Sequence, residues 1–497
     1  MSEITTKRKP QSQTMTWLLV AIWVIAGFIG LLFVEYSSFQ VILLTLTGGL
    51  VVILLLVSIS QELSINRSKY FIIIPAILIG FWLAAQILFN GLPPDSSVLN
   101  ILVRWKNYLG VIAVFVGALF VIDRFGRSAL TFRIFLIWFI FVLIAAISMI
   151  RYNYFNWALL MMYFGWIVYV TLVIPNLTNN QEDWLRLIKI VTIISLIPLL
   201  GFILKGFLSG DIFFTNPVRT RVTFVFNEPH KYAQYLAVCL VALTIFVYNA
   251  KRNTFNLFMW LGIIVLAILV VLTDSRNTIT FLIVFALSVY LYKYHYQRFR
   301  IWFSIGIFLL PVLSVLLGLG LFRINLDYDE INTLSSDRLT KFDDLAQNYL
   351  INAPFSDYLL GTSFQSTFQE SQQESQYVIR PVQKAVEEDR YQRAHIENMY
   401  YQIGLSHGLI GLFTFLLPLG LIYFLLHKSL RYTYDRNRIN IILAIASINA
   451  LLIQSIFTDT IPSFGNALSI FLPLLWLPPL LHLSHQRKST ERIDPQQ

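Results

Sequence analysis

The chain has 497 residues, of which 57% are hydrophobic and 13% are charged, and its formal net charge at pH 7 is +10. A soluble protein of this length would carry about 25% charged residues, so the composition excludes an ordinary soluble enzyme. Apolar runs of about 17 to 25 residues recur almost from end to end, and each is long enough to cross a bilayer as a helix. We therefore expect an all-α polytopic membrane protein.

The apolar runs predict about fourteen transmembrane helices, with one large external loop between the late helices. The first run follows a basic start but lacks a small-residue cleavage site, so we interpret it as a retained helix rather than a signal peptide. The expected spans are 17–34, 39–59, 70–90, 107–122, 131–150, 157–174, 186–207, 231–249, 256–272, 277–294, 301–321, 397–426, 439–457 and 466–483. The expected regions are a cytoplasmic tail (1–16), a first helix bundle (17–321), the external loop (322–396), the last helices (397–483) and a second cytoplasmic tail (484–497).

Lysine and arginine in the short loops predict the orientation of these helices. They gather in alternate loops, which places those loops and the N-terminus in the cytoplasm. The positive charge is therefore mainly an orientation signal, and no basic face of a soluble domain indicates a nucleic-acid partner. The basic residues in question are Arg67, Lys69, Arg124, Arg127, Arg133, Lys251, Arg252, Lys293, Arg298, Arg300, Lys428, Arg431, Arg436, Arg438, Arg487 and Lys488.

Three arginines lie on the external face under this topology, against the orientation bias: Arg219, Arg221 and Arg276. A single interfacial arginine commonly extends to lipid headgroups. Three at the mouths of neighbouring spans indicate an anion site, because the guanidinium fork binds phosphate bidentately. Pro229 suits the first turn of a helix and Asn227 can cap it, although Asn-Glu-Pro can also be only a cap and turn. Such a helix start presents backbone N–H groups that favour an anion.

The external loop, 322–396, is dense in charge and ends in His395-Ile396-Glu397-Asn398-Met399-Tyr400 before the next apolar run. Long loops between packed elements are usually functional. In its first half, apolar residues recur at a helical period, which predicts an amphipathic helix lying on the membrane or over the site. These residues are Leu339, Phe342, Leu345, Tyr349 and Leu350.

Four segments, in order, resemble the O-antigen polymerase and O-antigen ligase superfamily of polytopic glycosyltransferases. Residues 221–233 resemble its arginine followed by a helix start, although Glu228 and His230 depart from the usual residues. Residues 272–277 resemble its Ser-Arg turn between two spans, and 352–361 its Pro-x-Gly segment. Residues 395–400 with 408–412 resemble the element that opens the next helix. Together the segments cover roughly residues 215 to 415.

The resemblance implies transfer of a glycan from an undecaprenyl-diphosphate carrier, with a GT-C-like helical fold and without a nucleotide sugar, metal or cofactor. It implies a protein of the bacterial inner membrane whose active site faces the periplasm. The expected partners are the lipid-linked donor and acceptor, the bilayer and a protein that regulates chain length. The product would be an O-antigen (lipopolysaccharide), a capsule or an exopolysaccharide.

The residue types suit this chemistry. Departure of a lipid diphosphate develops negative charge, which fixed arginines stabilise, so we assign that role to Arg221 and Arg276, with Arg219 as a weaker third. The acceptor hydroxyl must lose a proton, and His395 is the expected base, with Glu397 as its orienter or replacement. The other expected substrate-binding residues are Asn227, Glu228, His230, Ser275, Asn398 and Tyr400.

Other site classes have little support in the sequence. The single cysteine, Cys239, falls within an expected span, which excludes a disulfide framework or a thiolate metal cluster. Asp327-Tyr328-Asp329 has the spacing of a metal-binding pair but lies in an acidic, solvated run, so we expect no metal.

Three functions remain open. We favour a glycan polymerase, because no large soluble domain follows the last helix and the loop is big enough for an acceptor pocket. The first alternative is a ligase that transfers the finished glycan to lipid A-core or a protein. The second is a polysaccharide transporter or flippase, for which fourteen helices are natural. Transporters place their key charges near the membrane midplane, whereas here the charges concentrate in external loops.

Overall fold

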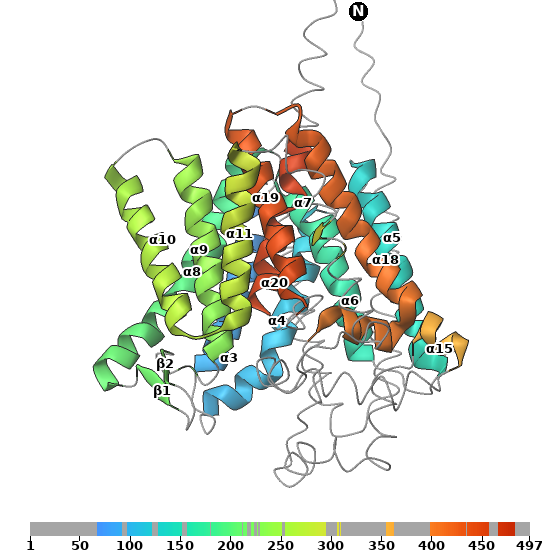
Figure 1. The fold of residues 1–497 in the computed structure, drawn as a ribbon, viewed down its shortest axis with the longest axis horizontal. Coiled ribbons are helices and arrows are strands. Elements are labelled where there is room, and N and C mark those ends of the chain that lie inside the picture. The colour runs from blue at the N-terminus through green and yellow to red at the C-terminus, as the bar shows by residue number, and fades with distance from the viewer. Residues whose placement is uncertain are drawn as a thin grey trace, which may run out of the picture.

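A computed structural model describes residues 67–91, 97–121, 128–151, 157–178, 180–210, 212–215, 220–222, 226, 229–250, 254–294, 306–307, 309, 354–361, 398–433, 435–456 and 466–482. Helices dominate these residues, as expected for an all-α membrane protein (Figure 1). The elements are α3 (Arg67–Gly91), α4 (Ser97–Val121), α5 (Ala129–Arg151), α6 (Trp157–Val168), the π-helix η3 (Tyr169–Val173), α7 (Ile174–Leu177), α8 (Gln181–Ser209), β1 (Phe213–Thr215), β2 (Thr220–Val222), α9 (Pro229–Asn249), α10 (Thr254–Leu272), α11 (Arg276–Tyr294), α15 (Phe355–Leu360), α18 (Met399–Leu430), α19 (Asp435–Gln454), α20 (Ala467–Phe471) and the 3-10 helix η5 (Leu472–Leu475).

Eight helices of the described residues are long and apolar enough to cross a membrane. They are α3, α5, the continuous run from α6 to α7, α8, α9, α11, α18 and α19, and three shorter apolar helices accompany them at Leu109–Val121, Leu257–Leu272 and Ala467–His482. The polytopic architecture is therefore confirmed in its coarse form. The expected spans 17–34 and 39–59 lie outside the described residues, as does the amphipathic helix expected at 339–350, and 301–321 is described only at residues 306, 307 and 309.

Helices α4 and α18 differ from the apolar pattern, the first in its extent and the second in its shape. The helix α4 begins at Ser97, ten residues before the expected span, because helical structure continues through the polar residues ahead of the apolar run. The helix α18 contains a kink at Gly408, whose backbone is far from helical (φ 69°, ψ −177°). The kink divides α18 into a first segment, 399–407, and a long segment, 409–430.

The centre of the bundle is formed by α9, α19 and the run from α20 through η5. About 78% of the α9 span and 83% of the α19 span is buried, against 33% for α11. Buried tryptophans connect distant helices there, because an indole N–H inside a protein needs an acceptor. Three of them donate to backbone carbonyls: Trp138 to Phe415 (2.8 Å), Trp166 to Ser469 (3.1 Å) and Trp184 to Leu474 (2.7 Å).

The outer faces of the bundle are apolar, as contact with lipid requires. Large hydrophobic side chains are exposed along α5, α8 and α10, and α10 lies at the edge of the bundle in Figure 1. The lone cysteine, Cys239, is buried in α9. It is a core residue, as predicted.

One end of the bundle collects the elements that carry the expected site. In Figure 1 the hairpin of β1 and β2, the turn between α10 and α11, and α15 all lie at the lower end. The basic-loop pattern predicts that this end faces the outside of the cell.

Candidate functional site

Arg221 is presented by a short β-hairpin. The strands β1 and β2 pair antiparallel, and Arg221 lies opposite Phe214. Phe226, which is almost completely buried, anchors the chain a few residues further on. Its ring packs between Phe202 of α8 and Tyr232 of α9, with centroid separations of 5.3 and 4.9 Å. This aromatic contact joins the hairpin region to the membrane helices. The next helix, α9, begins at Pro229, as the sequence predicts.

The turn between α10 and α11 is held by its own side chains. The hydroxyl of Thr273 donates to the carbonyl of Val270 (2.6 Å) and accepts from the amide of Ser275 (3.3 Å). Ser275 lies 3.1 Å from the hydroxyl of Thr278, and its carbonyl accepts the amide of Thr278 at the start of α11. The predicted Ser-Arg turn is therefore confirmed as a turn between two helices, with Ser275 contributing to its local structure.

Asp274 stands at the apex of this turn in an uncommon backbone conformation. Its φ is 49°, in the left-handed region that side chains other than glycine seldom occupy. Among the residues that the structure describes, no other non-glycine residue has a positive φ. Such backbone strain persists only where the surrounding structure maintains it. Here it directs a carboxylate towards the hairpin.

Arg221 and Asp274 form a loose ion pair. The guanidinium Nη2 lies 3.7 Å from Oδ2 of Asp274, and 26% of the arginine side chain and 42% of the aspartate side chain are exposed. The Nε of Arg221 is buried and has no hydrogen-bond partner among the described residues. An unsatisfied buried donor is costly and rare in native structures. The guanidinium therefore retains capacity for an anion with several oxygens.

Arg276 and His230 begin two neighbouring helices. Arg276 is the exposed first residue of α11, and His230 is the exposed second residue of α9. A cation at a helix N-terminus is opposed by the helix dipole. The combination of the dipole and the Arg276 guanidinium makes this point favourable for a negative ligand.

Asn398 and Tyr400 lie where α18 begins, and both are buried. The Tyr400 hydroxyl donates to the carbonyl of Leu452 on α19 (2.6 Å). The amide of Met399 donates to the carbonyl of Ser455 (2.9 Å). Tyr400, one of the expected substrate-binding residues, thus anchors the start of α18 to α19 through its hydroxyl.

Five of the expected site residues lie outside the described residues: Arg219, Asn227, Glu228, His395 and Glu397. Their roles stay predictions. The described members of the expected set are Arg221, His230, Ser275, Arg276, Asn398 and Tyr400, and of these the structure brings Arg221 to the turn that precedes Arg276.

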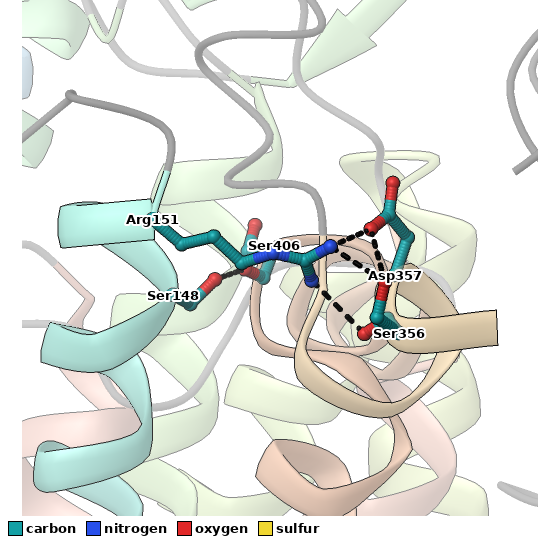
Figure 2. A network of polar contacts seen from close by, with 5 residues as sticks. All are labelled: Ser148, Arg151, Ser356, Asp357 and Ser406. Carbon is teal, nitrogen blue, oxygen red and sulfur yellow. Dashed lines mark hydrogen bonds and ion pairs between the residues drawn. The ribbon is translucent and has the colours of Figure 1, made fainter. Parts of the chain in front are cut away.

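Sequence reasoning missed a second arginine site at the same end of the molecule, shown in Figure 2. Arg151, the last residue of α5, contacts the start of α15. Its Nη1 donates to the carbonyl of Ser356 (3.1 Å), and its Nη2 donates to Ser356 Oγ (2.6 Å) and to Oδ1 of Asp357 (2.5 Å). The only available signal was a fourth arginine at the external end of an expected span.

The helix α15 is also packed directly on α18. Gly361, which follows α15, has φ 81° and lies so close to Gly408 that a Cβ on either residue would collide with backbone atoms of the other segment. Only glycine suits both positions. The Pro-x-Gly segment, 352–361, and the segment 408–412, which are separated in sequence, therefore meet in the fold.

Comparison with known proteins supports the resemblance drawn from the motifs. Residues 261–416 match the family model described as O-antigen ligase, a segment that includes the α10–α11 turn, α15 and the kink of α18. A search of curated proteins found no match. Over the matched segment, which is about a third of the chain, the sequence is similar to the O-antigen ligase family.

Proposed function

We propose that the protein is a glycan polymerase that joins undecaprenyl-diphosphate-linked repeat units on the external leaflet. The observation that supports this most directly is that the hydrogen-bonding capacity of the Arg221 guanidinium is only partly used. Its Nε lacks a hydrogen-bond partner among the described residues, and its ion pair with Asp274 is 3.7 Å long. A diphosphate offers more acceptor oxygens and more charge than one exposed carboxylate, so it would replace Asp274 favourably.

The proposed reaction is a direct displacement at the anomeric carbon of the donor. The acceptor hydroxyl forms the new glycosidic bond, the bond between that carbon and the diphosphate oxygen breaks, and the electron pair leaves with the lipid diphosphate. Arg221 and Arg276 stabilise this leaving charge, a contribution of about 2 to 4 kcal/mol for one well-placed donor group. The hydroxyl proton passes to a base, for which His395 is our first candidate and Glu397 and Glu228 are the replacements.

A ligase is the second candidate, because the matched family model is described as O-antigen ligase. It would use the same donor chemistry and differ only in the acceptor. The transporter interpretation is less favoured, because Arg221 lies in the β-hairpin and Arg276 at the start of α11, whereas transporters hold functional charges within their spans.

The deciding experiment supplies purified protein in lipid nanodiscs with lipid-diphosphate repeat units, with EDTA and without a nucleotide sugar. A polymerase lengthens the units, and a ligase transfers them only when a separate acceptor such as lipid A-core is added. We expect lengthening, and we expect His395→Ala to slow it about 10²- to 10⁴-fold, the usual contribution of a positioned base. Movement of the units across vesicles without lengthening or transfer would instead favour a transporter.

A further inference from the structure

The first segment of α18, residues 399–407, is held at its start by α19. The amide of Met399 donates to the carbonyl of Ser455, and the hydroxyl of Tyr400 donates to the carbonyl of Leu452. These two contacts fix the end of the segment that adjoins Asn398. They leave its other end, at the kink, to be fixed by different elements.

The end at the kink is held by α5 and by α15. In a regular helix each carbonyl accepts from the amide four residues on, and the non-helical backbone of Gly408 interrupts this series. The hydroxyl of Ser148 on α5 donates to the carbonyl of Ser406, just before the break, at 2.6 Å (Figure 2). The backbone at Gly361 packs against Gly408.

The guanidinium of Arg151 joins α15 to the end of α5. Its two terminal nitrogens make three contacts with the first turn of α15, to both oxygens of Ser356 and to the carboxylate of Asp357. The Asp357 side chain is only 12% exposed, so little water competes for this carboxylate. Arg151 and Ser148 lie one turn apart on α5 and act on α15 and α18 respectively.

We propose that Arg151 is a positioning residue that acts through α15. It holds α15, and the contact between Gly361 and Gly408 passes that position to the kink. The segment 399–407 and Asn398 at its start are thereby kept in register with the rest of the bundle. Because Asn398 is one of the expected substrate-binding residues, the part of this inference that concerns catalysis rests on the proposed function.

The contacts require an arginine. One nitrogen donates to the Ser356 carbonyl while the other serves Ser356 Oγ and Asp357. A lysine has a single ammonium and cannot span these acceptors in a fixed plane. Arg151→Lys should therefore retain part of the effect, because the charge opposite Asp357 remains.

The test compares Arg151→Ala, Arg151→Lys and a matched control, Arg133→Ala, which removes an exposed arginine from the other end of the same helix. The full chain in nanodiscs is followed by hydrogen–deuterium exchange and by transfer assays with lipid-linked units. We expect amide exchange in peptides covering 355–361 and 399–407 to be at least tenfold faster in Arg151→Ala and intermediate in Arg151→Lys. Exchange in 441–451 of α19 should not change, because its contacts are untouched.

Transfer by Arg151→Ala should be about tenfold slower or more, since small displacements of positioned groups have effects of that size. Donor binding should be unchanged, because the arginines proposed to hold the diphosphate, Arg221 and Arg276, lie on β2 and α11. Equal exchange of 399–407 in Arg151→Ala and wild type would overturn the proposal, and so would faster exchange with undiminished transfer or with lost donor binding. If the wild type transfers nothing, the proposed function fails, while the exchange result still decides whether Arg151 positions the segment.

Discussion

Two arginine–aspartate pairs lie at the same end of this bundle, and they differ in almost every respect. Arg151 meets Asp357 at 2.5 Å and adds two hydrogen bonds to Ser356, and the carboxylate is nearly buried. Arg221 reaches Asp274 only at 3.7 Å, the carboxylate is 42% exposed, and Nε lacks a partner in the described part of the chain. An arginine whose fork is fully engaged contributes to structure. One that is partly engaged is available to a ligand.

The comparison also refines how arginines on the outer face of a membrane protein are interpreted. Both residues run against the orientation bias, but the sequence analysis singled out only Arg221. The two arginines differ in the number of hydrogen-bond acceptors around them: Arg151 contacts three, whereas among the residues that are described Arg221 has only the loose contact with Asp274.

The largest expected effect comes from disabling the available arginine. Arg221→Lys keeps the charge and removes the fork, so it should slow transfer by about 30- to 1000-fold, which corresponds to about 2 to 4 kcal/mol in the barrier. The thermal midpoint should stay within a degree or two of the wild type, because the existing ion pair is loose. The measurements are transfer rates and thermal unfolding in nanodiscs. Full activity in the lysine variant would refute a bidentate contact with the diphosphate.

The second largest effect concerns the packing of Gly361 on Gly408, which lies next to the pair of Arg151 and Asp357. Gly361→Ala places a Cβ against residues 406–408 at a φ of 81°, so it should destabilise the protein by about 1 to 3 kcal/mol and lower the thermal midpoint. Gly404→Ala is the matched control, because it lies in the segment that contacts Gly361 and a Cβ there meets nothing within 4 Å. This control should be neutral or slightly stabilising. Equal midpoints for the two variants would contradict the close packing of α15 on the kink.

The smallest effect concerns the competing carboxylate. Asp274→Asn removes the charge that now faces Arg221, and exposed ion pairs of this kind are worth about 0.2 to 1 kcal/mol. We expect the donor to bind about 1.5- to 5-fold more tightly, as measured by isothermal titration with a lipid diphosphate. Weaker binding would mean that Asp274 orients Arg221 for the ligand rather than competing with it.

The sequence predicted those parts of the site that depend on local chemistry. Proline at the first turn of a helix and serine at the start of another are local signals, and both Pro229 and Ser275 lie as expected. The apolar runs likewise predicted the described membrane helices to within a few residues, except for α4. That helix continues beyond its apolar run because backbone hydrogen bonding does not stop where hydrophobicity does.

Contacts between distant residues could not be predicted from the pattern. Arg151 and Asp357 are 206 positions apart, and Tyr400 meets Leu452 across two helices. The sequence shows that a buried arginine needs a hydrogen-bond acceptor, but it does not show which distant residue will be that acceptor in the fold. For the same reason the sequence could not predict that the Tyr400 hydroxyl donates to the carbonyl of Leu452 on α19; a role of Tyr400 at the substrate stays a prediction.

The kink at Gly408 has a consequence for where the membrane surface lies. The long segment of α18, 409–430, rises about 33 Å at 1.5 Å per residue, which matches a hydrocarbon core of about 30 Å. The long segment alone is therefore sufficient for the crossing, and the residues before the kink are not needed for it. Under the proposed function, Asn398, at the start of the segment before the kink, is free to serve near the membrane surface, where a sugar chain and its lipid carrier would meet.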